Sequence, residues 1–142
     1  CNLFGHQAKN DTNHYHLINA VSEKCKTALR NKSKNIVIGG SGLPRREFLD
    51  ALSAAKFVTK ALYNYEELPS KINCGYYNDH SVIDYYDMIC KLYGITPEYI
   101  FDKTMPDGVL AKKMNIEKAL QFGWRPNRIE SSLRDFIAHE NA

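Results

Sequence analysis

The chain has 142 residues, a formal net charge of +3, 25% charged residues and 44% hydrophobic residues. This length and composition predict one soluble domain, spanning 1–142, that buries a true core. The charge is too mild to indicate a nucleic-acid partner, which would need basic residues gathered in a stripe. No apolar run approaches the ~20 residues that span a bilayer, and residues 1–20 show no signal-peptide pattern. We therefore expect a cytoplasmic protein without a membrane segment.

Apolar spacing predicts the first half of the fold. A helix is expected over 14–31, with one inward face formed by Leu17, Val21, Cys25 and Ala28. A short buried strand follows at 35–38. Asp50 is a plausible N-cap for a helix that ends near Asn64, and its inward face would be Ala51, Ala55, Val58 and Leu62. Residues 71–75 are predicted to form a second short strand.

The second half continues the alternation. Ser81 can cap a helix that ends before Gly94, with an inner face of Val82, Tyr86, Ile89, Cys90 and Tyr93. Residues 98–101 are a strand candidate and 105–108 a turn. Asn115 can cap a short helix through Phe122, and a last helix carries Ile129, Leu133, Phe136 and Ile137. Helices interleaved with short strands predict a single mixed α/β unit.

The cysteines and the basic residues give no strong functional signal. The four cysteines lie far apart without a C-x-x-C pair, which predicts buried free thiols and no metal site: Cys1, Cys25, Cys74 and Cys90. One local run of basic residues fits the solvated face of a helix: Lys24, Lys26, Arg30, Lys32 and Lys34. An acidic protein partner for this run is the alternative.

The segment 35–49 is the most informative part of the chain. Gly40 and Gly42 can adopt positive φ, Pro44 stiffens the exit, and Arg45 and Arg46 can offer planar donor groups to phosphate oxygens. This pattern predicts a phosphorylated ligand, although two arginines on a turn can also be simply solvated.

A dinucleotide-binding turn is a poor explanation of the same segment. That fingerprint needs G-x-G-x-x-G leading directly into a helix. Here Arg45 occupies the place of the third glycine, Pro44 interrupts, and the helical pattern begins only near Asp50. A phosphate-binding loop that ends in Gly-Lys-Ser/Thr is absent as well.

Six short motifs, in order and at nearly unchanged spacing, resemble the carboxyl-terminal half of the extended short-chain dehydrogenase/reductases (the NAD-dependent epimerase/dehydratase family). Within it they are most similar to the GDP-4-keto-6-deoxymannose epimerase/reductases, the GDP-L-fucose synthase group. The motifs are Asn-Leu-Phe-Gly (2–5), His-Leu-Ile-Asn-Ala (16–20), Gly-Ser-Gly-Leu-Pro-Arg-Arg-Glu-Phe-Leu (40–49), Ile-Asn-Cys-Gly (72–75), Pro-Asp-Gly (106–108) and Phe-Gly-Trp-Arg-Pro (122–126).

The resemblance implies a fold and a function. It implies the substrate-binding half of an extended short-chain dehydrogenase/reductase, lacking the Rossmann half, which would lie upstream, bind most of the NADP and carry the reduction machinery. It implies a GDP-deoxyhexose substrate, a homodimeric parent enzyme, and a chain that alone is inactive for reduction. Substrate contacts are implied at Asn2, Leu3, Leu17, Val21, Gly39, Arg46 and Lys112, and cofactor contacts at Asn2, Leu3 and His16.

His16 matches the acid of the epimerisation step in that family. Imidazole suits the task because its unperturbed pKa, near 6.5, lets it give or take a proton around neutral pH. By residue type alone, the cluster of His6, His14 and His16 could also bind a metal or lie on a solvated loop.

Two departures from the family pattern bear on the substrate. Gly39 stands where the family carries a tryptophan, and 50–53 reads Asp-Ala-Leu-Ser in place of His-Val-Asp-Asp. A different nucleotide-linked sugar, or a non-catalytic binding module, is therefore an alternative function.

Overall fold

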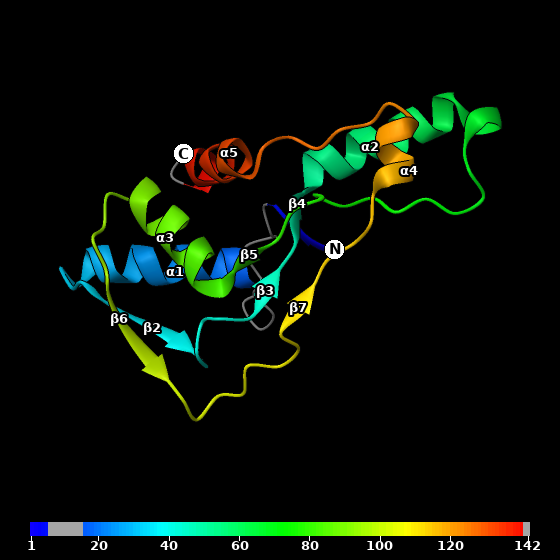
Figure 1. Ribbon diagram of the computed structural model, residues 1–142. Coiled ribbons are helices and arrows are strands. Elements are labelled where there is room, and N and C mark those ends of the chain that lie inside the picture. Colours follow the sequence, from blue (N-terminus) through cyan, green and yellow to red (C-terminus); the bar gives the residue numbers. More distant parts are fainter. Residues whose placement is uncertain (6–15, 141–142) are drawn as a thin grey trace.

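A computed structural model describes residues 1–5 and 16–140 of the protein. The predicted His6 and His14 lie outside the described residues. Figure 1 shows two groups of elements joined by a central strand region. One group holds α1 (Leu17–Arg30), α3 (Val82–Leu92) and α5 (Ile129–Glu140) above the strands β2 (Asn35–Gly39) and β6 (Glu98–Asp102). The other holds α2 (Ala51–Tyr63), α4 (Glu117–Gln121) and the short 3-10 turn Tyr65–Glu67.

The first group contains the larger hydrophobic core. β2 and β6 pair in parallel from Asn35↔Glu98 to Gly39↔Asp102. The helices bury most of the residues predicted for their inner faces, among them Val21, Cys25, Ile89, Cys90 and Leu133. The sulfur atoms of Cys25 and Cys90 lie 3.6 Å apart between α1 and α3. The mixed α/β prediction and the approximate bounds of these helices are confirmed.

The helix caps follow the sequence. At the start of α2, Asp50 Oδ1 accepts a 2.8 Å hydrogen bond from the Ser53 N–H. At the start of α3, the Asp84 N–H donates to Ser81 Oγ (3.1 Å) and the Ser81 N–H donates to Asp84 Oδ2 (2.8 Å), which is a capping box. For α4 the predicted cap is off by one residue: Ile116 is the N-cap and makes no side-chain cap bond, while Asn115, just before it, accepts a hydrogen bond from the Glu117 N–H through its Oδ1.

The central region is built on residues 45–50, which form β3 (Arg45–Arg46) and β4 (Phe48–Asp50) on either side of Glu47. β4 pairs in parallel with β1 (Asn2–Phe4), a strand that the sequence pattern did not reveal. β3 is the middle strand of a small sheet, between antiparallel β5 (His80–Ser81) and parallel β7 (Ala111–Lys112). Segments far apart in the sequence thus meet around residues 45–50.

The predicted inner face of α2 is wrong. Ala51, Ala55, Val58 and Leu62 are exposed, the last by 73%. The helix instead buries Ser53 and Phe57, and the Phe57 ring packs edge-on against Trp124 at 5.2 Å. Apolar residues occur on more than one face of α2, so spacing alone could not choose the buried one. The helix therefore presents an apolar stripe to solvent.

Two other expectations differ from the structure. Residues 71–75 form no strand, because no neighbouring strand among the described residues pairs with them. Cys1 is exposed and Cys74 only half-buried, so just two of the four thiols are core residues. No helix in the described ranges is long and apolar enough to cross a membrane.

Candidate functional site

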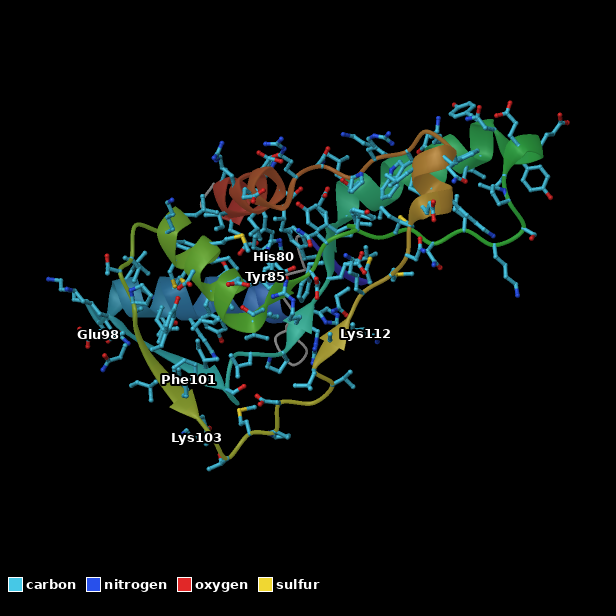
Figure 2. All side chains as sticks on the ribbon, viewed as in Figure 1. His80, Tyr85, Glu98, Phe101, Lys103 and Lys112 are labelled. Atoms are coloured by element: carbon cyan, nitrogen blue, oxygen red, sulfur yellow. The ribbon has the colours of Figure 1, made fainter. Side chains whose placement is uncertain are left out.

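The central sheet places Arg46 beside Lys112. In the order β5–β3–β7, Arg46 is the register partner of His80 on one side and of Lys112 on the other. Residues directly opposite each other in adjacent strands project from the same face of a sheet. Figure 2 shows Lys112 on β7, toward the edge of the sheet, and His80 close to Tyr85 on the inner side. The sheet therefore presents two cationic side chains together, here termed the Arg46–Lys112 pair.

The Arg46 guanidinium is held in place without being neutralised. Its Nη1 donates to the carbonyl oxygens of Val109 (2.6 Å) and Arg45 (2.8 Å). Across the described part of the chain, no carboxylate lies within ion-pair distance of Arg46 or Lys112. Lys112 is exposed and Arg46 half-buried. The pair consequently offers an oriented guanidinium and an ammonium to an anion.

Arg45 has a different role from its neighbour. Its Nε donates to Asp79 Oδ2 at 3.0 Å and its Nη2 to the Asp79 carbonyl at 2.6 Å. This hydrogen bond lowers the pKa of the Asp79 carboxyl below its ordinary value of 3.8. The sequence predicted that both arginines would be available to a ligand, whereas the structure uses Arg45 to fasten the loop before β5.

The glycine turn has the expected backbone but is already hydrogen-bonded. Gly40 and Gly42 both have φ near +75°. The Ser41 N–H donates to Asp107 Oδ1 at 2.6 Å, and the Gly40 N–H donates to the Asp102 carbonyl. An anion at this place would therefore contact the side chains of the Arg46–Lys112 pair rather than the turn. The turn runs into β3 and not into a helix, which confirms that it is not a dinucleotide fingerprint.

A concavity of about 360 Å³ lies beside the same turn. Phe101, Lys103 and Met105 line it together with the turn and Asp107. Figure 2 shows Phe101 and Lys103 at the end of β6. Gly39 adjoins this concavity, and the Met105 sulfur lies 2.8 Å from the point where a Cβ of residue 39 would be. Met105 thus fills space that a side chain at position 39 would need.

Glu47 is the important residue that sequence reasoning missed. It is 1% exposed, and its carboxylate accepts three backbone hydrogen bonds, which come from Tyr76 (2.7 Å), Tyr77 (3.0 Å) and Met114 (2.8 Å). The Glu47 carbonyl also accepts from the Asn2 N–H at 3.1 Å. Three separate segments are therefore anchored to the residue that follows Arg46. Nothing in the sequence around Glu47 indicates these distant N–H groups.

The residues expected at the start of the chain occupy two places. Asn2 and Leu3 lie on β1, where they pair with Phe48 and Leu49, which follow Arg46 by two and three residues. Leu3 is 49% exposed and Asn2 half-buried, so both present surface. His16 is exposed at the N-cap of α1, and its side chain makes no cap hydrogen bond. Its catalytic role stays a prediction.

Leu17 and Val21 do not join this surface in the described structure. Val21 is completely buried in the core, and Leu17 packs against that core from a half-buried position. Their predicted substrate contacts remain untested, but Val21 has no free surface to offer.

The basic run on α1 is partly engaged. Lys24 Nζ donates to the Val37 carbonyl at 2.7 Å and to the Tyr86 hydroxyl at 3.0 Å. Lys26 pairs with Glu23 (2.9 Å) and Glu140 (2.5 Å). These contacts give the run internal partners, so they favour a structural role over binding of an acidic protein. Among the described residues there is also no cluster of three or more histidine, cysteine or acidic side chains that could bind a metal.

Comparison with known proteins identifies the family. The model of the NAD dependent epimerase/dehydratase family matches residues 1–75, which is more than half of the chain. The protein belongs to this family. Over 135 residues it is 36% identical to a GDP-L-fucose synthase of Azorhizobium caulinodans, covering 94% of this chain and 43% of that protein. It is 35% identical over 124 residues to a GDP-L-colitose synthase of Yersinia pseudotuberculosis, covering 87% of this chain and 40% of that one.

Solved structures support the fold of this epimerase/dehydratase family member. A GDP-L-fucose synthetase of Naegleria fowleri bound to NADP superposes with a TM-score of 0.86 at 24% identity, over 99% of this chain and 45% of the other. A GDP-mannoheptose C4 reductase of Campylobacter jejuni with NADP bound gives 0.80 at 19% identity, over 99% and 51%. The chain therefore has a partial extended short-chain dehydrogenase/reductase fold and spans about two fifths of the length of these curated relatives.

Proposed function

We propose that the chain is the carboxyl-terminal, substrate-binding part of an NADP-dependent epimerase/reductase that acts on a GDP-linked 4-keto-6-deoxyhexose. The observation that carries the proposal is the Arg46–Lys112 pair, which two strands far apart in the sequence bring together. A guanidinium and an ammonium side by side suit a diphosphate, which carries two adjacent anionic groups. The relatives named above act on GDP-sugars by their names, which supports GDP as the nucleotide.

The described residues are also consistent with a longer protein in which another part binds the cofactor. They contain no strand, glycine turn and helix that would hold a dinucleotide, so NADP would be bound mainly outside this chain. Asn2, Leu3 and His16 are the residues of this chain that would border it. When bound, NADPH supplies the hydride for reduction of the C4 carbonyl. The exposed apolar stripe of α2 would be covered in such a protein.

His16 would act in the epimerisation step. A carbonyl at C4 acidifies the protons on C3 and C5, so a base can remove one and an acid can return it on the opposite face. An exposed imidazole at the start of α1, with no hydrogen bond to the cap, is free to turn toward a ligand. In the complete protein, His16→Asn should stop exchange of these protons with solvent deuterium while leaving GDP-sugar binding nearly unchanged. Undiminished exchange would refute the catalytic role.

Binding is tested separately by calorimetry with GDP and GDP-mannose. Arg46→Ala should weaken GDP binding by about 1–3 kcal/mol, because it removes a charge-assisted contact. Arg125→Ala is the matched control, since Arg125 is exposed and lies on the α4 side of the molecule. Equal affinities of Arg46→Ala and the unsubstituted protein would show that the diphosphate is not bound here.

A second candidate function is a non-catalytic nucleotide-sugar-binding module. It is favoured by Asp50, which stands where the family carries a histidine and whose side chain is used in structural hydrogen bonds. Its carboxylate caps α2 and accepts a 2.9 Å hydrogen bond from Ser132 Oγ. Normal GDP-mannose binding in the complete protein, without any solvent exchange of substrate protons, would identify this alternative.

A further inference from the structure

Two buried thiols, Cys25 and Cys90, lie against each other in the larger core. Cys25 is on α1 and Cys90 on α3, and Figure 1 shows these two helices packed one over the other. Both side chains are 0% exposed, and their sulfur atoms are 3.6 Å apart, within hydrogen-bond distance for sulfur. A single buried cysteine acts as a small apolar side chain, whereas two whose sulfurs are in contact can also react with each other.

Hydrogen bonds hold the two helices together on both sides of this pair. Ser22 Oγ and the Tyr93 hydroxyl share a hydrogen bond of 2.7 Å, and Lys24 Nζ donates to the Tyr86 hydroxyl at 3.0 Å. Tyr86 and Tyr93 lie four residues before and three residues after Cys90, which places all three on one face of α3. Because α1 and α3 are fixed in this way, the sulfurs stay opposite each other, and they need only approach from 3.6 Å to the ~2.05 Å of an S–S bond.

Tyr99 is the side chain that separates Cys90 from solvent. Its hydroxyl lies 4.0 Å from Cys90 Sγ and donates a 2.6 Å hydrogen bond to Oδ1 of the exposed Asp87. A rotation of the Tyr99 ring would therefore admit a small solute to the sulfur. The hydrogen bond between the two thiols also lowers the pKa of Cys90 below its ordinary value of 9.0 and raises the pKa of Cys25. The thiolate is the reactive form of cysteine, so Cys90 is the thiol that would react first.

We propose that Cys25 and Cys90 are a site of reversible oxidation, at which hydrogen peroxide produces a disulfide that joins α1 to α3. The Cys90 thiolate attacks one peroxide oxygen, which gives a sulfenic acid on Cys90 and a hydroxide ion that takes up the Cys90 proton to form water. The Cys25 sulfur then attacks the Cys90 sulfur, and the hydroxyl group leaves with the Cys25 proton as a second water. The two thiols lose two electrons and the peroxide gains them. The inference is independent of the proposed function.

The disulfide would close a long loop of the chain. Cys25 and Cys90 are 65 positions apart, and the segment between them contains β2, β3, β4 and α2, including Arg46. Cross-linking such a loop restricts the unfolded chain and therefore stabilises the folded one, provided that the bond fits the native packing. We expect the melting temperature to rise by about 5–10 °C on oxidation.

The first test identifies the bond directly. The complete protein is treated with hydrogen peroxide, its remaining thiols are blocked by alkylation under denaturing conditions, and its peptides are analysed by mass spectrometry. We expect a linked pair of peptides that contain Cys25 and Cys90, two hydrogen atoms lighter than the separate peptides, and its separation by dithiothreitol. Recovery of Cys25 and Cys90 as unlinked peptides, or linked to other cysteines instead, would overturn the inference.

The second test shows whether the bond fits the native fold, by thermal unfolding of the complete protein before and after peroxide treatment. The unsubstituted protein should melt about 5–10 °C higher after oxidation and return to its original value in dithiothreitol. Cys74→Ala is the matched control, since Cys74 is a half-buried thiol outside the pair, and this variant should show the same rise. Cys90→Ala should show none. A lower melting temperature of the oxidised protein, or an equal rise in Cys90→Ala, would contradict the inference.

Discussion

Replacing Glu47 by glutamine should destabilise the protein far more than an ordinary loss of one charge. The carboxylate is 1% exposed and accepts three backbone hydrogen bonds of 2.7–3.0 Å. A glutamine oxygen can still accept from Tyr76 and Tyr77, but its NH₂ group would then face the Met114 N–H, donor against donor. A buried donor without a partner costs about 1–3 kcal/mol, and bonds to a charged acceptor are worth more than bonds to a neutral one. We therefore expect a loss of about 2–4 kcal/mol.

The measurement is equilibrium unfolding in urea. The midpoint should fall while the slope stays the same, because the surface exposed on unfolding is unchanged. Glu98→Gln is the matched control, since Glu98 is exposed on β6, and its effect should stay within about 0.5 kcal/mol. A Glu47→Gln protein as stable as the Glu98→Gln protein would mean that the Glu47 carboxylate does not anchor the segments at 76–77 and 114.

Three further predictions concern separate parts of the structure. Ser81→Ala should lower stability by about 1 kcal/mol in thermal unfolding, because it removes one half of the capping box. Ser70→Ala, at an exposed serine, should leave the stability unchanged, and equal melting temperatures of the two variants would contradict the capping role of Ser81. Phe57→Ala should lower the free energy of unfolding by about 3–5 kcal/mol in urea, whereas Leu62→Ala, on the exposed stripe of α2, should leave it nearly unchanged. The reverse order would mean that the face of α2 predicted from the sequence is the buried one. Arg45→Gln should raise the pKa of Asp79 toward 3.8, as followed by NMR titration. Because the pKa of Asp79 is lower in the folded than in the unfolded protein, the Arg45–Asp79 pair stabilises the protein above about pH 4, and this contribution disappears as the pH falls through the folded pKa. An Asp79 titration that Arg45→Gln leaves unchanged would refute the pairing.

The elements that the sequence predicted well are those with local signals. Asp50 and Ser81 mark helix starts because a cap needs only a residue within the next turn. The inner faces of α1, α3 and α5 follow from spacing because each has a single apolar face. The strand predicted at 98–101 is present as β6, which spans Glu98–Asp102.

What the sequence could not predict depends on contacts between distant segments. β1 and β3 are only two or three residues long and acquire their conformation from partners more than thirty positions away. α2 carries apolar residues on two faces, and only the position of Trp124 decides which one is buried. At the site, the Arg46–Lys112 pair was expected from family resemblance, but the separate task of Arg45 and the anchoring by Glu47 depend on loops that spacing does not reveal.

The most direct test of the account is a crystal structure of the complete protein with GDP bound. The account predicts that diphosphate oxygens lie about 3 Å from the Arg46 guanidinium and the Lys112 ammonium. A diphosphate bound elsewhere, with Arg46 and Lys112 both facing solvent, would contradict it.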